Sequence, residues 1–240
     1  MTTLPQLPNE VLKEAKMMWE LEGSTLQSGP TASGQTPVYR SDGGGRWKSE
    51  LSDISLWTPT HRRVWRAMTT ICDGGAQPII VPVTETIDAP WPVVGGQLQR
   101  STPDLAHSDN TFFSDGTGFG ENVINATLYL DVALRDTTVF LTFSTGGPPM
   151  GGEYFSVNHP ISRWRLYRIG TVRPFGSTVW QCTIKPPFRE AIGAGADVEF
   201  DHPRCVMRLA ETNSLDTTLE PYFFGRPSAA FVEAFPPFPV

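Results

Sequence analysis

The sequence predicts a mainly β protein, and three observations lead to that prediction. Its 22 glycines and 22 prolines are too frequent in 240 residues for a long helical bundle. Several segments alternate apolar and polar residues with the period of two that is typical of a half-buried strand. With 14 Phe, 7 Trp and 5 Tyr, the chain can bury a sizeable apolar core. We therefore expect many short strands joined by turns, with few helices.

The first segment, residues 8–22, is predicted to be a helix. Leu12, Ala15 and Trp19 recur at helical spacing, Asn9 is placed to cap the first turn, and Gly23 follows at the expected end. From Gly23 to about residue 56 the pattern changes to strands and turns. Residues 46–53 alternate charged or polar side chains with an apolar-rich set, which predicts a half-buried strand after the glycine-rich turn at 41–45.

A second helix is predicted from Thr58 to about residue 72. Thr58 is a suitable N-cap, and Pro59 occupies the first helical position, where its missing N–H costs nothing. Val64, Met68 and Ile71 recur at spacings of four and three, and Asp73-Gly74-Gly75 ends the helix, because glycine accepts the left-handed conformation found there. A short apolar strand over 78–83 should follow.

The rest of the sequence predicts a long irregular loop followed by a series of strands. Residues 84–122 are rich in glycine and proline and show little periodicity, and a loop of that length is usually functional or mobile. Turn signals then separate strands at intervals that suggest a small sandwich or barrel. The expected strands cover about 123–132, 137–144, 153–157, 163–172, 178–184, 197–200, 204–210 and 228–234.

Charge and cysteine content exclude several functional classes. A net charge of −6 argues against a general nucleic-acid binder, which needs a basic stripe to contact phosphates. No apolar run is long enough for a membrane span, so we expect no membrane segment and no secretion signal. Cys72, Cys182 and Cys205 are widely spaced, so we expect three reduced thiols buried in apolar surroundings.

No catalytic constellation is recognisable, and we predict that the protein is not an enzyme and needs no metal or cofactor. The chain lacks GxSxG, GxxxxGK and HExxH, and no carboxylate pair stands out for a hydrolase. Its four histidines lie in four segments, where we expect them to be solvated or capping residues. The spacing of Asp104, His107, Asp109 and Asp115 matches no metal-ligand set that coordination geometry supports.

Arginine and tryptophan recur together, a combination that is enriched in protein–protein hot spots. The candidate interface residues are Arg46, Trp47, Arg62, Trp65, Arg163, Trp164 and Arg165. A second interpretation stays open, in which the tryptophans belong to the core and the arginines cover them with their aliphatic stems.

The segment 46–83 also resembles a known family. Arg46-Trp47 opens a strand, a helix containing Arg and Trp follows, and Asp73-Gly74-Gly75-Ala76-Gln77-Pro78 leads into an apolar strand. This order resembles the amino-terminal half of tail proteins from long-tailed, siphophage-like bacteriophages. Stretches similar to phage and prophage minor tail proteins are Tyr167-Arg168-Ile169, Pro186-Pro187-Phe188-Arg189-Glu190, 198–209 and 228–234. The chain is most similar to the distal tail protein family.

The resemblance implies a virion structural protein of the tail tip, made in the host cytoplasm. Such proteins form a hexameric ring that adapts the tail tube to the hub or baseplate, and DNA passes through the ring during viral genome ejection without being specifically bound. The implied fold is a tail-tube-like β-sandwich with a packed helix, formed by 1–83 with 201–240. Residues 84–200 would be an inserted small β-barrel or sandwich module. The helix expected over 8–22 has no counterpart in the family pattern.

The resemblance also implies the partners, and one alternative function remains. The partners would be further copies of the chain, the tail tube protein, the hub or baseplate proteins and the tape measure protein. The alternative is a carbohydrate- or receptor-binding adsorption module, suggested by the strand-rich centre and by aromatic residues expected to be exposed: Trp91, Phe112, Phe113 and Phe119.

Overall fold

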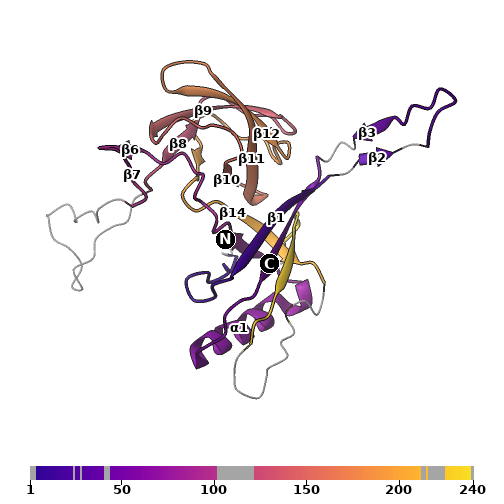
Figure 1. Cartoon of the computed structure of the whole chain (residues 1–240), viewed down its shortest axis with the longest axis vertical. Helices are drawn as coiled ribbons and strands as arrows, with labels where there is room; N and C mark the ends of the chain where they lie inside the picture. Colours follow the sequence, from indigo (N-terminus) through magenta and orange to yellow (C-terminus); the bar gives the residue numbers. More distant parts are fainter. Residues whose placement is uncertain are drawn as a thin grey trace.

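The structure is a computed structural model that describes residues 4–23, 25–27, 29–40, 44–101, 122–211, 215 and 225–238. It confirms the predicted fold class, with 40% of the described residues in strands and 9% in helix. Two sheets dominate: a five-stranded sheet with the helix α1 packed on it, and a six-stranded, nearly closed sheet (Figure 1).

The five-stranded sheet takes its strands from both ends of the chain. Its order is β1-β4-β15-β14-β5, and all neighbouring strands are antiparallel. Residues 5–7 add a short parallel bridge, Gln6 to Ile80, along the outer edge of β5. The bounds are β1 (Lys16–Glu22), β4 (Arg46–Ser52), β5 (Ile79–Pro82), β14 (Arg204–Leu209) and β15 (Ala229–Glu233).

The strand β4 confirms the predicted alternation. Trp47, Ser49 and Leu51 are buried, whereas Arg46, Lys48 and Glu50 between them are exposed. Because successive side chains of a strand point to opposite faces, this segment gives the sheet one apolar face and one charged face.

The helix predicted over 8–22 is wrong. Leu12 N–H donates to the Pro8 carbonyl at 2.9 Å, which closes a single helical turn, and the chain then enters β1. All seven residues of β1 pair with β4. Met17, Trp19 and Leu21 pack against the core at strand spacing. The segment carries both periods, and the pairing with β4 decides between them, because tertiary packing overrides weak local propensity.

The predicted second helix is confirmed as α1 (Pro59–Cys72), followed by a single 3₁₀ turn, η1 (Asp73–Gly75). Thr58 caps it by accepting a hydrogen bond from the backbone N–H of His61 at 3.2 Å, and Asp73 ends it in the left-handed conformation. Trp65, Met68 and Cys72 lie buried in the same core as the five-stranded sheet.

Replacing Thr58 by alanine is expected to lower the free energy of unfolding by about 1 kcal/mol, because one of the first N–H groups of α1 loses its acceptor. Urea unfolding followed by circular dichroism measures the change. Thr58→Ser keeps the hydroxyl and should retain most of the stability. Equal unfolding midpoints for the alanine and serine variants would show that the cap contributes nothing.

The six-stranded sheet has the order β10-β11-β12-β9-β8-β13 with antiparallel neighbours. Ser156 and Glu199 exchange two backbone hydrogen bonds of 2.9 Å, which connect the β13 end back to β10 and nearly close the barrel. The bounds are β8 (Asn125–Leu128), β9 (Thr138–Thr145), β10 (Tyr154–His159), β11 (Arg163–Pro174), β12 (Val179–Lys185) and β13 (Asp197–Val198).

The barrel has a core of its own. Its interior holds apolar side chains from every strand, among them Leu141, Phe155, Tyr167 and Phe200. The ring of Tyr167 stacks on Phe188 with centroids 4.6 Å apart. The strand predicted over 123–132 is shorter than expected, because the ladder with β9 ends at Leu128. Beyond it, Tyr129 N–H donates to the Phe140 carbonyl at 2.8 Å, and Val132 bridges to Ile192.

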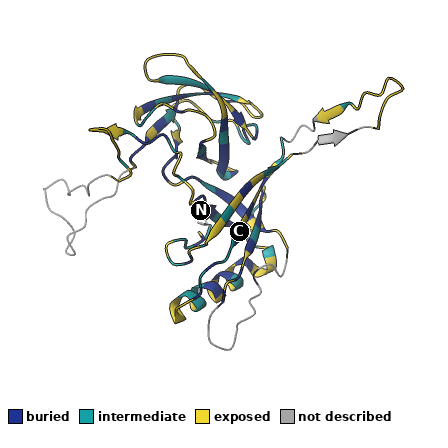
Figure 2. Cartoon of the chain, viewed as in Figure 1, coloured by how far each residue is buried: buried dark blue, intermediate teal, exposed yellow. Residues whose placement is uncertain are grey.

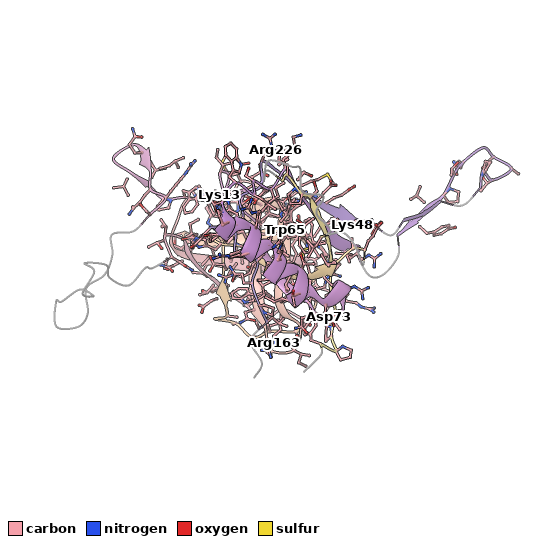
Figure 3. All side chains as sticks on the ribbon, turned by 90° about the horizontal axis from the view of Figure 1, so that it is seen from below. Lys13, Lys48, Trp65, Asp73, Arg163 and Arg226 are labelled. Carbon is pink, nitrogen blue, oxygen red and sulfur yellow. The ribbon has the colours of Figure 1, made fainter. Side chains whose placement is uncertain are left out.

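Two small hairpins complete the described structure. The first joins β2 (Thr25–Gln27) to β3 (Val38–Arg40), and the second joins β6 (Val93–Val94) to β7 (Gln97–Leu98). They project from opposite sides of the body in both views (Figures 1 and 3).

Candidate functional site

The two sheets are joined by a buried cluster of charges. Glu233, at the end of β15, accepts hydrogen bonds from Arg165 Nη1 on β11 at 3.3 Å and from Arg189 Nη2 at 2.8 Å. Its Oε2 also accepts from the backbone N–H of Trp47 at 3.2 Å. The side chains of Arg165 and Glu233 have no exposed surface. One carboxylate thus holds two guanidinium groups and two sheets together.

Aromatic rings cover the rest of this cluster. The Arg165 guanidinium carbon lies 5.1 Å from the Phe235 ring centroid and 5.8 Å from that of Phe238, and Arg189 lies 5.1 Å from Phe235. Within the described part of the chain, Nε and Nη2 of Arg165 have no hydrogen-bond partner. Cation–π contacts therefore replace hydrogen bonds for part of this buried cation.

Trp47 is the second link between the sheets. Its indole N–H donates to the carbonyl of Leu166 on β11 at 2.7 Å. Its ring centroid lies 6.2 Å from that of Trp19 and 5.8 Å from that of Tyr154, and the Arg168 guanidinium lies 5.7 Å away. Both Trp47 and Arg165, proposed from sequence as intermolecular contacts, are thus engaged inside the chain.

The other candidate interface residues are spread over the molecule. Trp65 is buried in α1 and donates to the carbonyl of Leu215 at 3.2 Å (Figure 3). Trp164 is partly buried beneath the Arg204 guanidinium, 4.4 Å from its ring centroid. Arg46 is half exposed and pairs with Glu22, while Arg62 and Arg163 are half-buried. The structure does not bring these seven residues into one surface.

The first hairpin presents apolar surface that was not predicted from the sequence. Val38 is 58% exposed and Tyr39 is 62% exposed, and residues 29–36 are exposed throughout (Figure 2). No charged residue lies between Glu22 and Arg40 in a chain with 18% charged residues. That absence of charge was the available signal, because a solvated surface loop normally carries charge.

The second hairpin repeats these features on the other side. Val93, Val94 and Leu98 are 63%, 61% and 53% exposed, and no charged residue lies between Asp88 and Arg100. Exposed apolar residues that gather on a projecting element are typical of interaction sites rather than of free surface.

The histidine prediction is wrong for His159. This side chain is buried in the barrel, and its Nε2 lies 2.9 Å from the Tyr167 hydroxyl. Burial lowers its pKa to about 4, so the imidazole is neutral at pH 7. His61 is partly buried and its Nδ1 lies 3.1 Å from the Ser55 carbonyl, and His202 is exposed. His107 lies outside the described residues.

The cysteine prediction is confirmed, since Cys72, Cys182 and Cys205 are all buried and unpaired. Burial raises the thiol pKa of Cys72 to about 11 and those of Cys182 and Cys205 to about 12, which keeps them protonated and unreactive.

Of the four aromatic residues proposed for sugar binding, Trp91 is not exposed as expected. Trp91 is buried, and its indole N–H donates to the Thr86 carbonyl at 2.8 Å. The three phenylalanines Phe112, Phe113 and Phe119 lie outside the described residues, as do Asp104, Asp109 and Asp115.

Two further findings concern only the residues that the structure describes. Among them, no three His, Cys, Asp or Glu side chains come close enough together to hold a metal ion. No helix among them has the length and apolar character to cross a membrane. Comparison with models of known protein families gives no match, and none of the curated proteins matches the sequence.

Proposed function

We propose that the protein is a structural component of a bacteriophage tail tip, a ring-forming adaptor between the tail tube and the hub or baseplate. The observation that carries the proposal is the pair of hairpins on opposite sides of one body, each with exposed apolar side chains and few charges. The sequence stretches similar to minor tail proteins supply the assignment to a tail.

The hairpins suit a head-to-tail assembly. An isolated two-stranded hairpin is at best marginally stable in water, so a projecting one is expected to gain stability from a neighbour. A ring requires two different, complementary surfaces on each copy, because only a heterologous contact repeats around a rotation axis. Two distinct arms that point in opposite directions can reach both neighbours.

The remaining features fit the same role. The Glu233 cluster and Trp47 connect the two sheets, so a load on one sheet is transmitted to the other. The net charge of −6 suits a channel that must release a passing polyanion, because like charges repel. The virion is the location that follows from this role, and the expected partners are further copies, the tube, the hub or baseplate and the tape measure protein.

The test is the mass of the purified full-length protein in solution, followed by negative-stain imaging. We expect a ring, with six subunits for the distal tail role and a central hole wide enough for duplex DNA. Val38→Ser with Tyr39→Ser should shift the mass toward the monomer, whereas Met150→Ser, at an 85% exposed position elsewhere, should leave it unchanged. A monomer at all concentrations that also fails to assemble with a tail tube partner would contradict the proposal.

A further inference from the structure

We propose that a groove on the outside of the barrel binds a neutral saccharide. The groove has a volume of about 690 Å³, within the range of small-ligand sites. It runs along the seam where β13 meets β8 and where the barrel closes on β10. This binding site is independent of ring formation and of the two hairpins.

The seam places polar side chains outward by strand alternation. Ala126 of β8 pairs with Val198 of β13, and both are buried, so their neighbours along each strand face the groove. Asn125 on β8 and Asp197 on β13 are exposed there. Across the seam, Asn158 on β10 is the direct partner of Trp164 on β11, which puts an amide and an indole side by side.

A buried carboxylate organises the floor of the groove. Glu199 Oε1 accepts hydrogen bonds from the backbone N–H groups of Asp201 and His202, at 3.0 and 2.9 Å. Its Oε2 accepts from Asn122 Nδ2 at 3.1 Å and lies 3.6 Å from Arg204 Nη2. Glu199 is therefore satisfied within the protein, and it holds the Asn122 amide in one orientation.

Three other groups have their hydrogen-bonding capacity open. The Asn158 amide, the Asp197 carboxylate and the indole N–H of Trp164 have no partner among the described residues. An amide supplies both donors and an acceptor, a carboxylate supplies acceptors, and an indole supplies one donor with an apolar ring. Together they can match the alternating hydroxyl and C–H surface of a sugar.

The charges of the groove decide between ligand classes. Asp197 makes it negative, since the guanidinium of Arg204 offsets the charge of Glu199 and also lies over the Trp164 ring. A phosphate, a nucleotide or an acidic sugar would be repelled by like charge. A wholly apolar ligand would leave the amides and the carboxylate unpaired, which costs binding free energy. A neutral, hydroxyl-rich ligand is not repelled by the charge and can pair with the amides and the carboxylate.

The experiment uses the full chain and a panel of neutral oligosaccharides built from hexoses, 6-deoxyhexoses and N-acetylhexosamines. Saturation-transfer difference NMR identifies a binder, and isothermal titration calorimetry measures its Kd. We expect saturable binding of at least one neutral member. Asn158→Ala and Asp197→Asn should each weaken it by roughly tenfold, the loss of about one well-placed hydrogen bond. Gln97→Ala, which removes an exposed amide on the second hairpin, should leave the Kd unchanged.

Each contrary result would overturn the assignment. These results are no binding by any neutral member, a stronger response to uronic or sialic acid sugars, or an unchanged Kd in both groove variants. Circular dichroism and urea unfolding of the variants separate loss of the ligand from loss of the fold. Because the titration does not depend on subunit number, a monomeric protein could still bind sugar, and a ring could still fail to bind it.

Discussion

Replacing Glu233 by glutamine is expected to lower the free energy of unfolding by about 3–5 kcal/mol, because it leaves two arginines without a buried counter-charge. Arg165 has no exposed surface, and its guanidinium can reach no water without opening the contact between the sheets. The glutamine keeps the shape of the side chain, but it removes the charge and replaces one acceptor oxygen by an NH2 group that faces other N–H donors. Urea unfolding of the full chain measures it.

The matched control is Glu22→Gln. Glu22 is an exposed carboxylate that also holds two cations, with Lys48 Nζ at 2.7 Å and Arg46 Nε at 3.3 Å. Those partners keep the Glu22 pKa below its usual value, but solvent screens the pair, so this variant should unfold close to the wild type. Equal unfolding midpoints for the Glu233 and Glu22 variants would show that the charge cluster does not stabilise the contact between the two sheets.

A double variant refines the test. Arg189→Gln combined with Glu233→Gln should cost less than the sum of the two single changes, because Arg189→Gln removes a cation that Glu233→Gln leaves unpaired. Additive effects would show that Arg189 and Glu233 act independently.

Replacing Trp47 by alanine is expected to cost about 3–5 kcal/mol, because it empties a fully buried site between Trp19 and Tyr154. The variant also strands the Leu166 carbonyl, which accepts the indole N–H. Trp47→Phe should cost less, since it keeps a ring in the site and loses the hydrogen bond alone. Thermal and urea unfolding report both changes.

Trp57→Ala is the comparison, because Trp57 is 61% exposed and its truncation opens no buried cavity. We expect that variant to stay within about 0.5 kcal/mol of the wild type, as most surface substitutions do. A Trp47→Ala protein as stable as Trp57→Ala would mean that the two sheets are held together without this contact.

The two helix predictions show how far local pattern reaches. For α1 the cap, the proline and the terminating glycines lie within the segment, and each acts through hydrogen bonds to nearby residues. For residues 8–22 the local pattern fitted two periods equally well. Pairing with a strand about thirty residues further along the chain decided the outcome, and a single sequence does not display that pairing.

For the tryptophans and arginines, too, the sequence predicted the kind of contact but not the partners. Their abundance indicated large buried or interface contacts, but one residue type serves both purposes. Burial of Arg165 depends on Glu233 and Phe235, about seventy residues away, and burial of Trp91 depends on the barrel core, whose strands begin at Asn125. Neither partner was visible from the neighbouring residues.

The candidate binding surfaces also depend partly on sequence and partly on tertiary structure. The uncharged run between Glu22 and Arg40 is a property of the sequence, but only the fold shows that it forms a projecting hairpin. The groove could not be foreseen, because Asn125, Asn158, Trp164 and Asp197 meet only when the barrel closes through Ser156 and Glu199.

By itself the sequence determined the mainly β class, the position of α1, the alternation of β4, most strand positions and the burial of the three cysteines. These depend on periodicity, caps and turns, which act over a few residues. Only the tertiary structure decided that residues 16–22 form a strand, that the barrel closes, and that His159 and Trp91 are buried. It also decided the charge cluster and the groove. Those features depend on contacts between distant segments, whose free energy no local pattern records.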